Sequence, residues 1–84
     1  MEEKQVGTVD HFFDKISVGM IKLTDAVKVG DKIRIKGNTS DLVQDVDSMQ
    51  IDRVPASEGK AGDLISIKVN ERVRKDDNVY KVEN

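Results

Sequence analysis

The sequence repeats a similar phrase three times, and this repetition constrains the fold more than any other feature. The phrases are "KVGDKIRIKG" from Lys28, "KAGDLISIKV" from Lys60 and "RKDDNVYKV" from Arg74. Each has a basic residue, a spacer, a pair ending in Asp, and then alternating apolar positions. Glycine supplies the unusual backbone angle of a tight turn, and the following Asp can bond nearby backbone N–H groups. The repetition therefore indicates architecture: three turns that lead into strands. In the third, Asp76 replaces the glycine and tolerates such a turn less well.

Alternation of apolar residues predicts strands with one buried face. After the first turn, for example, Ile33 and Ile35 point to one side and the intervening basic residues to the other;. We expect six strands, over residues 4–12, 16–23, 31–37, 42–51, 63–70 and 77–83. Short antiparallel strands in an open sheet leave unpaired edges, so closure is favoured. The expected fold is all-β: a single domain over residues 1–84, forming a small closed six-stranded barrel.

Two of the expected strands carry apolar residues on both parities. In 16–23 the parity changes between Met20 and Ile21, and 42–51 behaves in the same way. Such a change suggests a β-bulge or a strand that crosses from one side of the barrel to another. The nearest approach to an amphipathic helix covers residues 37–50. We interpret it as a strand after a Gly-Asn turn, because Asp and β-branched residues lower helix propensity.

Length and charge narrow the classes of function. The 84 residues suit one domain, and the 14 basic and 16 acidic residues are interspersed, which weakens the case for tight nonspecific binding to nucleic acid;. There is no cysteine for a disulfide or a thiolate zinc site;. No apolar run is long enough for a membrane span, and the acidic N-terminus is not a secretory signal. We therefore expect a soluble, cytoplasmic protein that does not contact a membrane.

Longer motifs carry a resemblance to a family. These are "G-x-V" near the start, "V-K-V-G-D-x-I" before the third strand, "V-x-S-M-Q", and "A-x-x-G-x-x-I-x-I-x-V". Together they resemble the second domain of translational GTPases of the elongation factor Tu type, over nearly the whole chain. The resemblance implies a six-stranded Greek-key barrel that stands alone, without the GTPase domain. Similar barrels also occur as appended accessory domains on collagenase-like peptidases. The chain lacks the Gly-Lys-Ser/Thr loop that cradles phosphates, so no nucleotide or other cofactor is expected.

Three groups of polar residues were weighed for catalysis or metal binding. His11, the only histidine, has no serine in a nucleophile elbow, and we interpret it as a surface strand residue. An acidic stretch from Asp41 to Asp52 lacks the spacing of a calcium loop and is interpreted as a solvated strand face. Asp76 and Asp77 are interpreted as exposed turn residues rather than an acid–base pair. We thus expect no catalytic and no metal-binding residues, and a protein that is not an enzyme.

The candidate binding residues are basic or aromatic. Lys32, Arg34 and Lys36 share one strand face, where simple solvent exposure is the favoured interpretation; Lys68, Arg72, Arg74 and Lys75 gather before the last strand, where exposure and phosphate contact are evenly balanced;. Phe12 and Phe13 are adjacent, so in a strand one would face outward and could anchor a protein partner. A bend that buries both is slightly favoured.

The leading functional interpretation is a noncatalytic binding module that contacts RNA, a ribonucleoprotein or a translation-related protein. The alternative is an accessory or scaffold subunit that docks onto a separate GTPase or peptidase-type enzyme. Salt-dependent RNA affinity would support the first. A contiguous exposed apolar patch around Phe12 or Phe13 would support the second. In either case we expect binding groups on loops such as "RVPASEGK".

Overall fold

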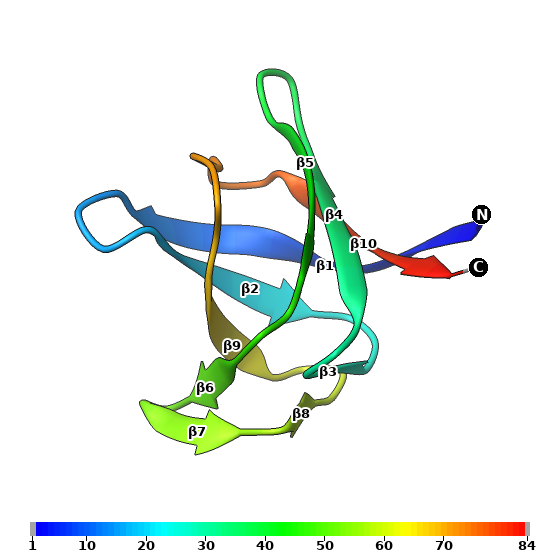
Figure 1. The fold of residues 1–84 in the computed structure, drawn as a ribbon, viewed down its shortest axis with the longest axis vertical. Coiled ribbons are helices and arrows are strands. Elements are labelled where there is room, and N and C mark those ends of the chain that lie inside the picture. Colours follow the sequence, from blue (N-terminus) through cyan, green and yellow to red (C-terminus); the bar gives the residue numbers. More distant parts are fainter. Residues whose placement is uncertain (1, 84) are drawn as a thin grey trace.

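A single curved antiparallel sheet forms most of the molecule (Figure 1). The computed structural model describes residues 2–83. Eight strands pair in the order β5-β4-β10-β1-β2-β9-β6-β7, and β3 pairs with β8. The strands are β1 (Glu2–Phe13), β2 (Val18–Leu23), β3 (Val27–Lys28), β4 (Lys32–Lys36), β5 (Asp41–Asp45), β6 (Met49–Ile51), β7 (Val54–Ala56), β8 (Glu58–Gly59), β9 (Leu64–Lys68) and β10 (Asn78–Glu83). Residues 2–83 include no helix that is long and apolar enough to cross a membrane.

The apolar core lies inside the curve of the sheet. Alternate residues of each long strand point inward, as period-2 patterning requires. In β4 these are Ile33 and Ile35, and in β9 they are Ile65 and Ile67, all at most 2% exposed. The remaining core residues come from the other strands and the loops: Val6, Val9, Ile21, Leu23, Val27, Leu42, Val46, Met49, Val69, Val73 and Val79. The all-β prediction is confirmed.

The predicted closed barrel needs correction, because backbone hydrogen bonds do not close the sheet. Its two edge strands, β5 and β7, do not pair with each other. Where β5 approaches the end of β9, a side chain joins them instead. The Gln44 Nε2 atom donates to the Lys68 carbonyl over 2.9 Å, and Gln44 Oε1 accepts from the Asn70 backbone N–H over 2.8 Å. We call this contact the Gln44 seam.

Several strand boundaries also differ from the prediction. The expected strand at 42–51 is two strands, because the chain leaves β4 after β5 and joins β9 and β7 as β6. This is the predicted crossing, and it explains the change of parity there. The stretch expected to be an exposed loop contains β7 and β8, which are too short to show alternation.

The bulges lie in β1 rather than in 16–23. β2 alternates without interruption, so Val18 and Met20 point outward and the predicted change of side is wrong. In β1, the register shifts against β10 around Val6 and against β2 around Asp10. The Val6 carbonyl, released from the ladder, accepts the backbone N–H groups of Thr24 and Asp25. These bulges let one long strand bend around the core while pairing on both sides.

The repeated phrase forms the same turn three times, over Lys28–Asp31, Lys60–Asp63 and Arg74–Asp77. In each, the Asp side chain accepts the first residue's N–H at 2.8–2.9 Å, and the Asp N–H donates to the first residue's carbonyl. The third residue has positive φ, as in a type II turn: 99° at Gly30, 94° at Gly62 and 73° at Asp76;. The prediction of architecture is confirmed, and Asp76 adopts the left-handed angle despite its side chain.

Each turn also grips a buried residue elsewhere in the chain, that is, it holds both backbone groups of that residue by hydrogen bonds. Two backbone hydrogen bonds of 2.8–2.9 Å join the turn to the buried residue. The buried residue's carbonyl accepts from the N–H of the turn's third residue, and its N–H donates to the carbonyl of the turn's Asp. The gripped residues are Val46, Leu23 and Val9 for the three turns in order, and each is at most 2% exposed. Since the turns satisfy backbone groups that strand pairing leaves free, they link separate parts of the sheet.

Asp77 lies deeper than expected. The sequence predicts an exposed turn residue, but Asp77 is only 6% exposed because its carboxylate packs over Gly37. A Cβ atom added to Gly37 would lie 1.9 Å from Asp77 Oδ1. Glycine at this position therefore allows the third turn to pack against the β4–β5 connection.

Gly30→Val should lower the free energy of unfolding by about 1–3 kcal/mol, because valine is strained at positive φ. The space around Gly30 is empty within 4 Å, so the loss would report backbone strain and not a clash. Denaturant unfolding checks the effect, with Val29→Ala in the same turn as the control. Equal stability of the Gly30 variant and the wild type would contradict this account of the turn.

Gln44→Met should destabilise the protein by about 1–3 kcal/mol, since it leaves the Lys68 carbonyl and the Asn70 N–H without their partner;. Gln50→Met, at an exposed position, provides the matched control. Urea titrations of both variants measure the difference. If the two variants unfold at the same urea concentration, the seam contributes nothing to the free energy of unfolding.

Candidate functional site

The β1–β2 hairpin places its two phenylalanines on opposite sides. Phe12 packs against the core, whereas Phe13 is 41% exposed. The ring of His11 meets that of Phe13 edge-on, with 4.5 Å between centroids and 64° between planes. The prediction that one ring faces outward is confirmed, and the slightly favoured bend that buries both is wrong. His11 is a surface residue whose closest aromatic neighbour is Phe13.

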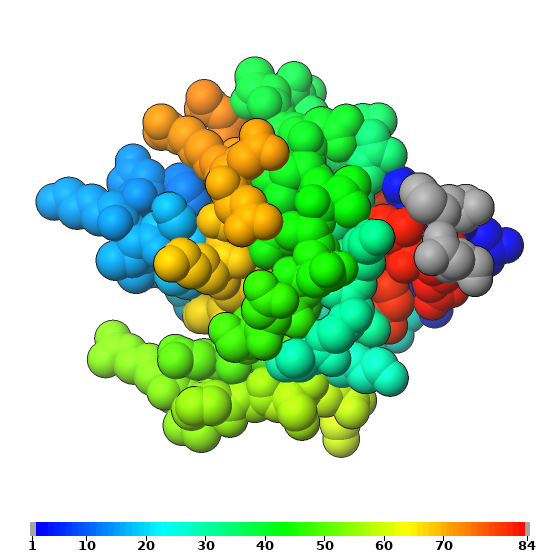
Figure 2. Space-filling model, viewed as in Figure 1, coloured from blue at the N-terminus to red at the C-terminus, as the bar shows by residue number. Residues whose placement is uncertain are grey.

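Phe13 forms one wall of an apolar hollow on the outer face of the sheet. Ile16, 61% exposed, continues this wall, and Asp52 and Arg53 of the β6–β7 turn form the opposite rim. The floor consists of outward-facing side chains of β2 and β9: Val18, Met20 and Leu64. The hollow has a volume of about 480 Å³. Figure 2 shows the hairpin, in blue, and the β6–β7 turn, in yellow-green, projecting on the same side with a gap between them.

The hollow continues along β9 into a polar region. Ser66 and Gln50 line both the apolar hollow and a smaller one of about 200 Å³, which also contains Ser48 and Lys68. Ser48 and Lys68 in turn line a third hollow of about 110 Å³ that reaches Asn70 beside the Gln44 seam. We call these three hollows, each of which shares lining residues with the next, the β9 groove. It is apolar at the hairpin end and polar at the seam end.

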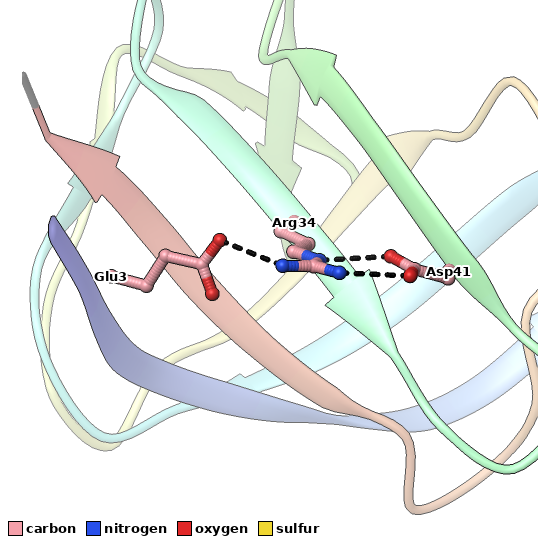
Figure 3. Close-up of polar contacts among 3 residues, drawn as sticks. All are labelled: Glu3, Arg34 and Asp41. Atoms are coloured by element: carbon pink, nitrogen blue, oxygen red, sulfur yellow. Dashed lines mark hydrogen bonds and ion pairs between the residues drawn. The ribbon is translucent and has the colours of Figure 1, made fainter. Parts of the chain in front are cut away.

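The first predicted basic cluster faces carboxylates. Arg34 donates from Nε and Nη2 to the two carboxylate oxygens of Asp41, both over 2.8 Å, and from Nη1 to Glu3 over 3.0 Å (Figure 3). Lys32 and Lys36 stand opposite Asp45 and Asp41 in the β4–β5 register. The hydrogen bonds that Arg34 donates lower the pKa of Asp41, and acceptance of these bonds by Asp41 and Glu3 raises the pKa of Arg34. This arrangement links β5, β4 and β1, and it spans β10, which lies between β4 and β1.

The depressed pKa of Asp41 predicts a dependence of stability on pH. A carboxyl whose folded pKa is lowered contributes stability that is present above its unfolded value, about 4, and is lost as pH falls through the folded value;. Asp41→Asn should therefore unfold more easily at neutral pH but lose less stability on acidification. Denaturant titrations at neutral and acidic pH test this, with Asp45→Asn on the same strand as the control. An unchanged pH profile would contradict it.

The second predicted cluster lies at the other end of the sheet. Lys68 is on β9 and forms part of the groove, whereas Arg72, Arg74 and Lys75 are exposed on the segment before β10. Within residues 2–83, the ion pairs involve Lys4, Arg34 and Lys81 rather than this cluster. Lys68 thus lies on β9 and the other three on the segment that follows, and their role in binding stays a prediction.

Five of the 16 acidic residues have clear structural roles. Asp31, Asp63 and Asp77 support the three turns, Asp41 binds Arg34, and Asp25 pairs with Lys4 over 2.6 Å. The hydrogen bond from Lys4 lowers the pKa of Asp25. In the described part of the chain, no three His, Asp or Glu residues gather in a geometry suited to a metal ion.

Most residues of the groove are not predicted from the sequence. The parity of Val18 and Met20 suggests a bulge or a crossing strand, and neither Leu64 nor Gln50 is a predicted binding residue. The signal was present, because a strand with apolar residues on both faces must bury its second face or leave it exposed. Of the candidate binding residues, Lys68 and Phe13 line the groove; the sequence predicts an outward position for one of the two phenylalanines without saying which.

Comparison with known proteins points to peptidases. No family model matches the chain. The chain is 39% identical over 77 residues to an uncharacterized protease of Methanocaldococcus jannaschii; the match covers 90% of this chain and 19% of the protease. The chain therefore spans about a fifth of the length of the curated relative that it matches. This relationship concerns one segment of a much longer protein.

Two crystal structures share the fold. Both are of the C-terminal domain of a protein described as a U32 peptidase from Geobacillus thermoleovorans, the second being its selenomethionine variant. The TM-scores are 0.88 and 0.86, with 11% and 10% identity. The first comparison covers 93% of this chain and 91% of that domain, and the second covers 90% and 96%. At this identity the likeness concerns the fold alone.

These findings correct the family resemblance. The resemblance to the second domain of elongation factor Tu is wrong, because the sequence relative is a protease and the matching domains come from a peptidase. The motifs behind it consist of a turn followed by a strand, which different small β-proteins can share. The interpretation as an RNA-binding, translation-related module rested on that resemblance and is withdrawn with it.

Proposed function

We propose that this chain is a noncatalytic accessory domain of a peptidase-type protein. The observation that carries the proposal is the 39% identity to a protease of which the matched region forms only 19%. The chemistry would then belong to the remaining part of that protein. Occurrence of the same fold as a separate C-terminal domain of a peptidase supports this division.

The use of the titratable side chains is consistent with an accessory role. The aspartates that are buried or paired support turns and ion pairs, and the His11 ring meets Phe13 edge-on. A nucleophilic mechanism needs a base within hydrogen-bond reach of its nucleophile. The exposed surface of the β9 groove is instead suited to contact with another polypeptide;.

A domain exchange tests the accessory role. Removing the matched region from the Methanocaldococcus jannaschii protease should reduce hydrolysis of a labelled, denatured protein substrate, and inserting this chain in its place should restore it. The 84-residue chain alone should hydrolyse nothing. An unrelated small β-domain inserted at the same place is the control.

Two results would refute the accessory role. One is hydrolysis by the isolated chain that survives repeated purification. The other is full activity of the protease without the matched region, provided that its remaining part is folded by circular dichroism.

A further inference from the structure

The β9 groove has the dimensions of a binding site for one extended chain. It follows the outward side chains of Leu64, Ser66 and Lys68 and ends at Asn70. Six residues of extended backbone span about 20 Å, and the two strand spacings from β2 through β9 to β6 give a width of about 10 Å;. The footprint is therefore on the order of 200 Å², well below the roughly 800 Å² per partner of a stable interface between folded proteins. A second folded copy of the domain is thus a poor fit to the groove by itself.

The spacing of the lining groups also matches an extended partner. Groove-facing residues occur at every second position of β9, and an extended polypeptide presents side chains to one face with the same period;. An α-helix would present them at a different repeat.

The chemistry of the groove changes along its length in a way that suits a polypeptide. At the hairpin end, Phe13, Ile16 and Met20 surround a hollow of about 480 Å³, within the range of pockets that bury apolar groups;. Further along, Ser66 and Gln50 offer both donors and acceptors, as peptide groups require. At the seam end, Lys68 and Asp47 supply one charge of each sign, which complements the mixed donors and acceptors of a backbone better than a single anion.

The position of the chain ends leaves this groove accessible. Glu2 pairs with Glu83, so both ends of the described chain lie together, whereas Phe13 is at the other end of β1 (Figure 1). Another domain joined at either end would be attached away from the β1–β2 hairpin, which forms the groove wall. The groove is therefore better placed for a mobile polypeptide than for the point of attachment.

We propose that the β9 groove binds an extended, unfolded segment of the substrate polypeptide, with a bulky apolar side chain in the hollow beside Phe13 and Ile16. The proposal rests on the proposed function, because the bound segment belongs to a substrate of the peptidase-type protein that contains the domain. It assigns to the domain the capture of unfolded chain that carries exposed apolar residues.

Fluorescence anisotropy of a labelled peptide tests the proposal on the isolated chain. The probe is a peptide of about eight polar residues that carries one phenylalanine near one end, compared with the same peptide in which alanine replaces phenylalanine. The phenylalanine peptide should bind saturably and the alanine peptide at least about tenfold more weakly, as expected from loss of one buried apolar side chain.

Two substitutions of exposed apolar residues locate the site. Ile16→Asp should weaken binding of the phenylalanine peptide about tenfold, because it places a charge in the hollow. Val43→Asp is the matched control, since Val43 is 52% exposed on β5 and outside the groove. In amide NMR spectra of the wild type, the peptide should shift the signals of Leu64, Ser66 and Lys68 and leave those of β4, which does not line the groove, in place.

Three outcomes would overturn the proposal: no binding of either peptide, equal loss of binding in the two variants, or a concentration-dependent dimer in which the groove amides are shifted without peptide. The last would make a second copy the occupant. These results leave the domain exchange unaffected. Conversely, peptide binding together with full activity of the protease without its matched region would refute the accessory role and retain the groove as a peptide site.

Discussion

Three turns with the same hydrogen bonds hold the fold together. Each uses an Asp carboxylate to fix its own first N–H group and then grips a buried residue of another segment through two backbone hydrogen bonds. The gripped residues, Val9, Leu23 and Val46, come from regions where the chain leaves one pairing and begins another. A small domain has little core with which to stabilise such transitions. The turns supply the missing backbone partners, and the sheet can therefore bend around a core of small aliphatic residues.

Because the turns and the inward-facing residues stabilise the fold, outward-facing residues of the sheet are available for binding. The inward residues of β2 and β9 fill the core, while their outward neighbours Val18, Met20 and Leu64 form an exposed apolar floor. Contiguous apolar surface on a soluble domain commonly marks a contact with another molecule. The outer face of β4 and β5 behaves differently, because there Arg34 is bound by Asp41 and Glu3. The distribution of apolar and paired charged residues thus singles out the β9 groove.

The sequence predicts the local features well and the long-range ones less well. Gly30 and Gly62 mark their turns because few other residues adopt positive φ, and the alternation around Ile33 and Ile65 identifies the long strands;. The role of Gln44 is not visible, since a polar residue at an inward position acquires its partners only when β9 lies beside it. The groove is missed for the same reason: its floor combines β2 and β9, which are distant in sequence. The family resemblance failed because its motifs describe turns and strands, not a site.

The Gln44 seam makes the border between β5 and β9 easier to open locally than the rest of the sheet. Elsewhere, adjacent strands of the large sheet are joined by ladders of backbone bonds, but β5 meets the end of β9 through a single side-chain amide. Because a cooperative ladder must break over several residues while an amide contact breaks alone, thermal fluctuations should separate this border first. The polar end of the groove lies on that border. A fluctuation that parts it would widen the groove while β1, β2 and β10 keep their pairing, so that the domain could admit chains of different bulk without unfolding.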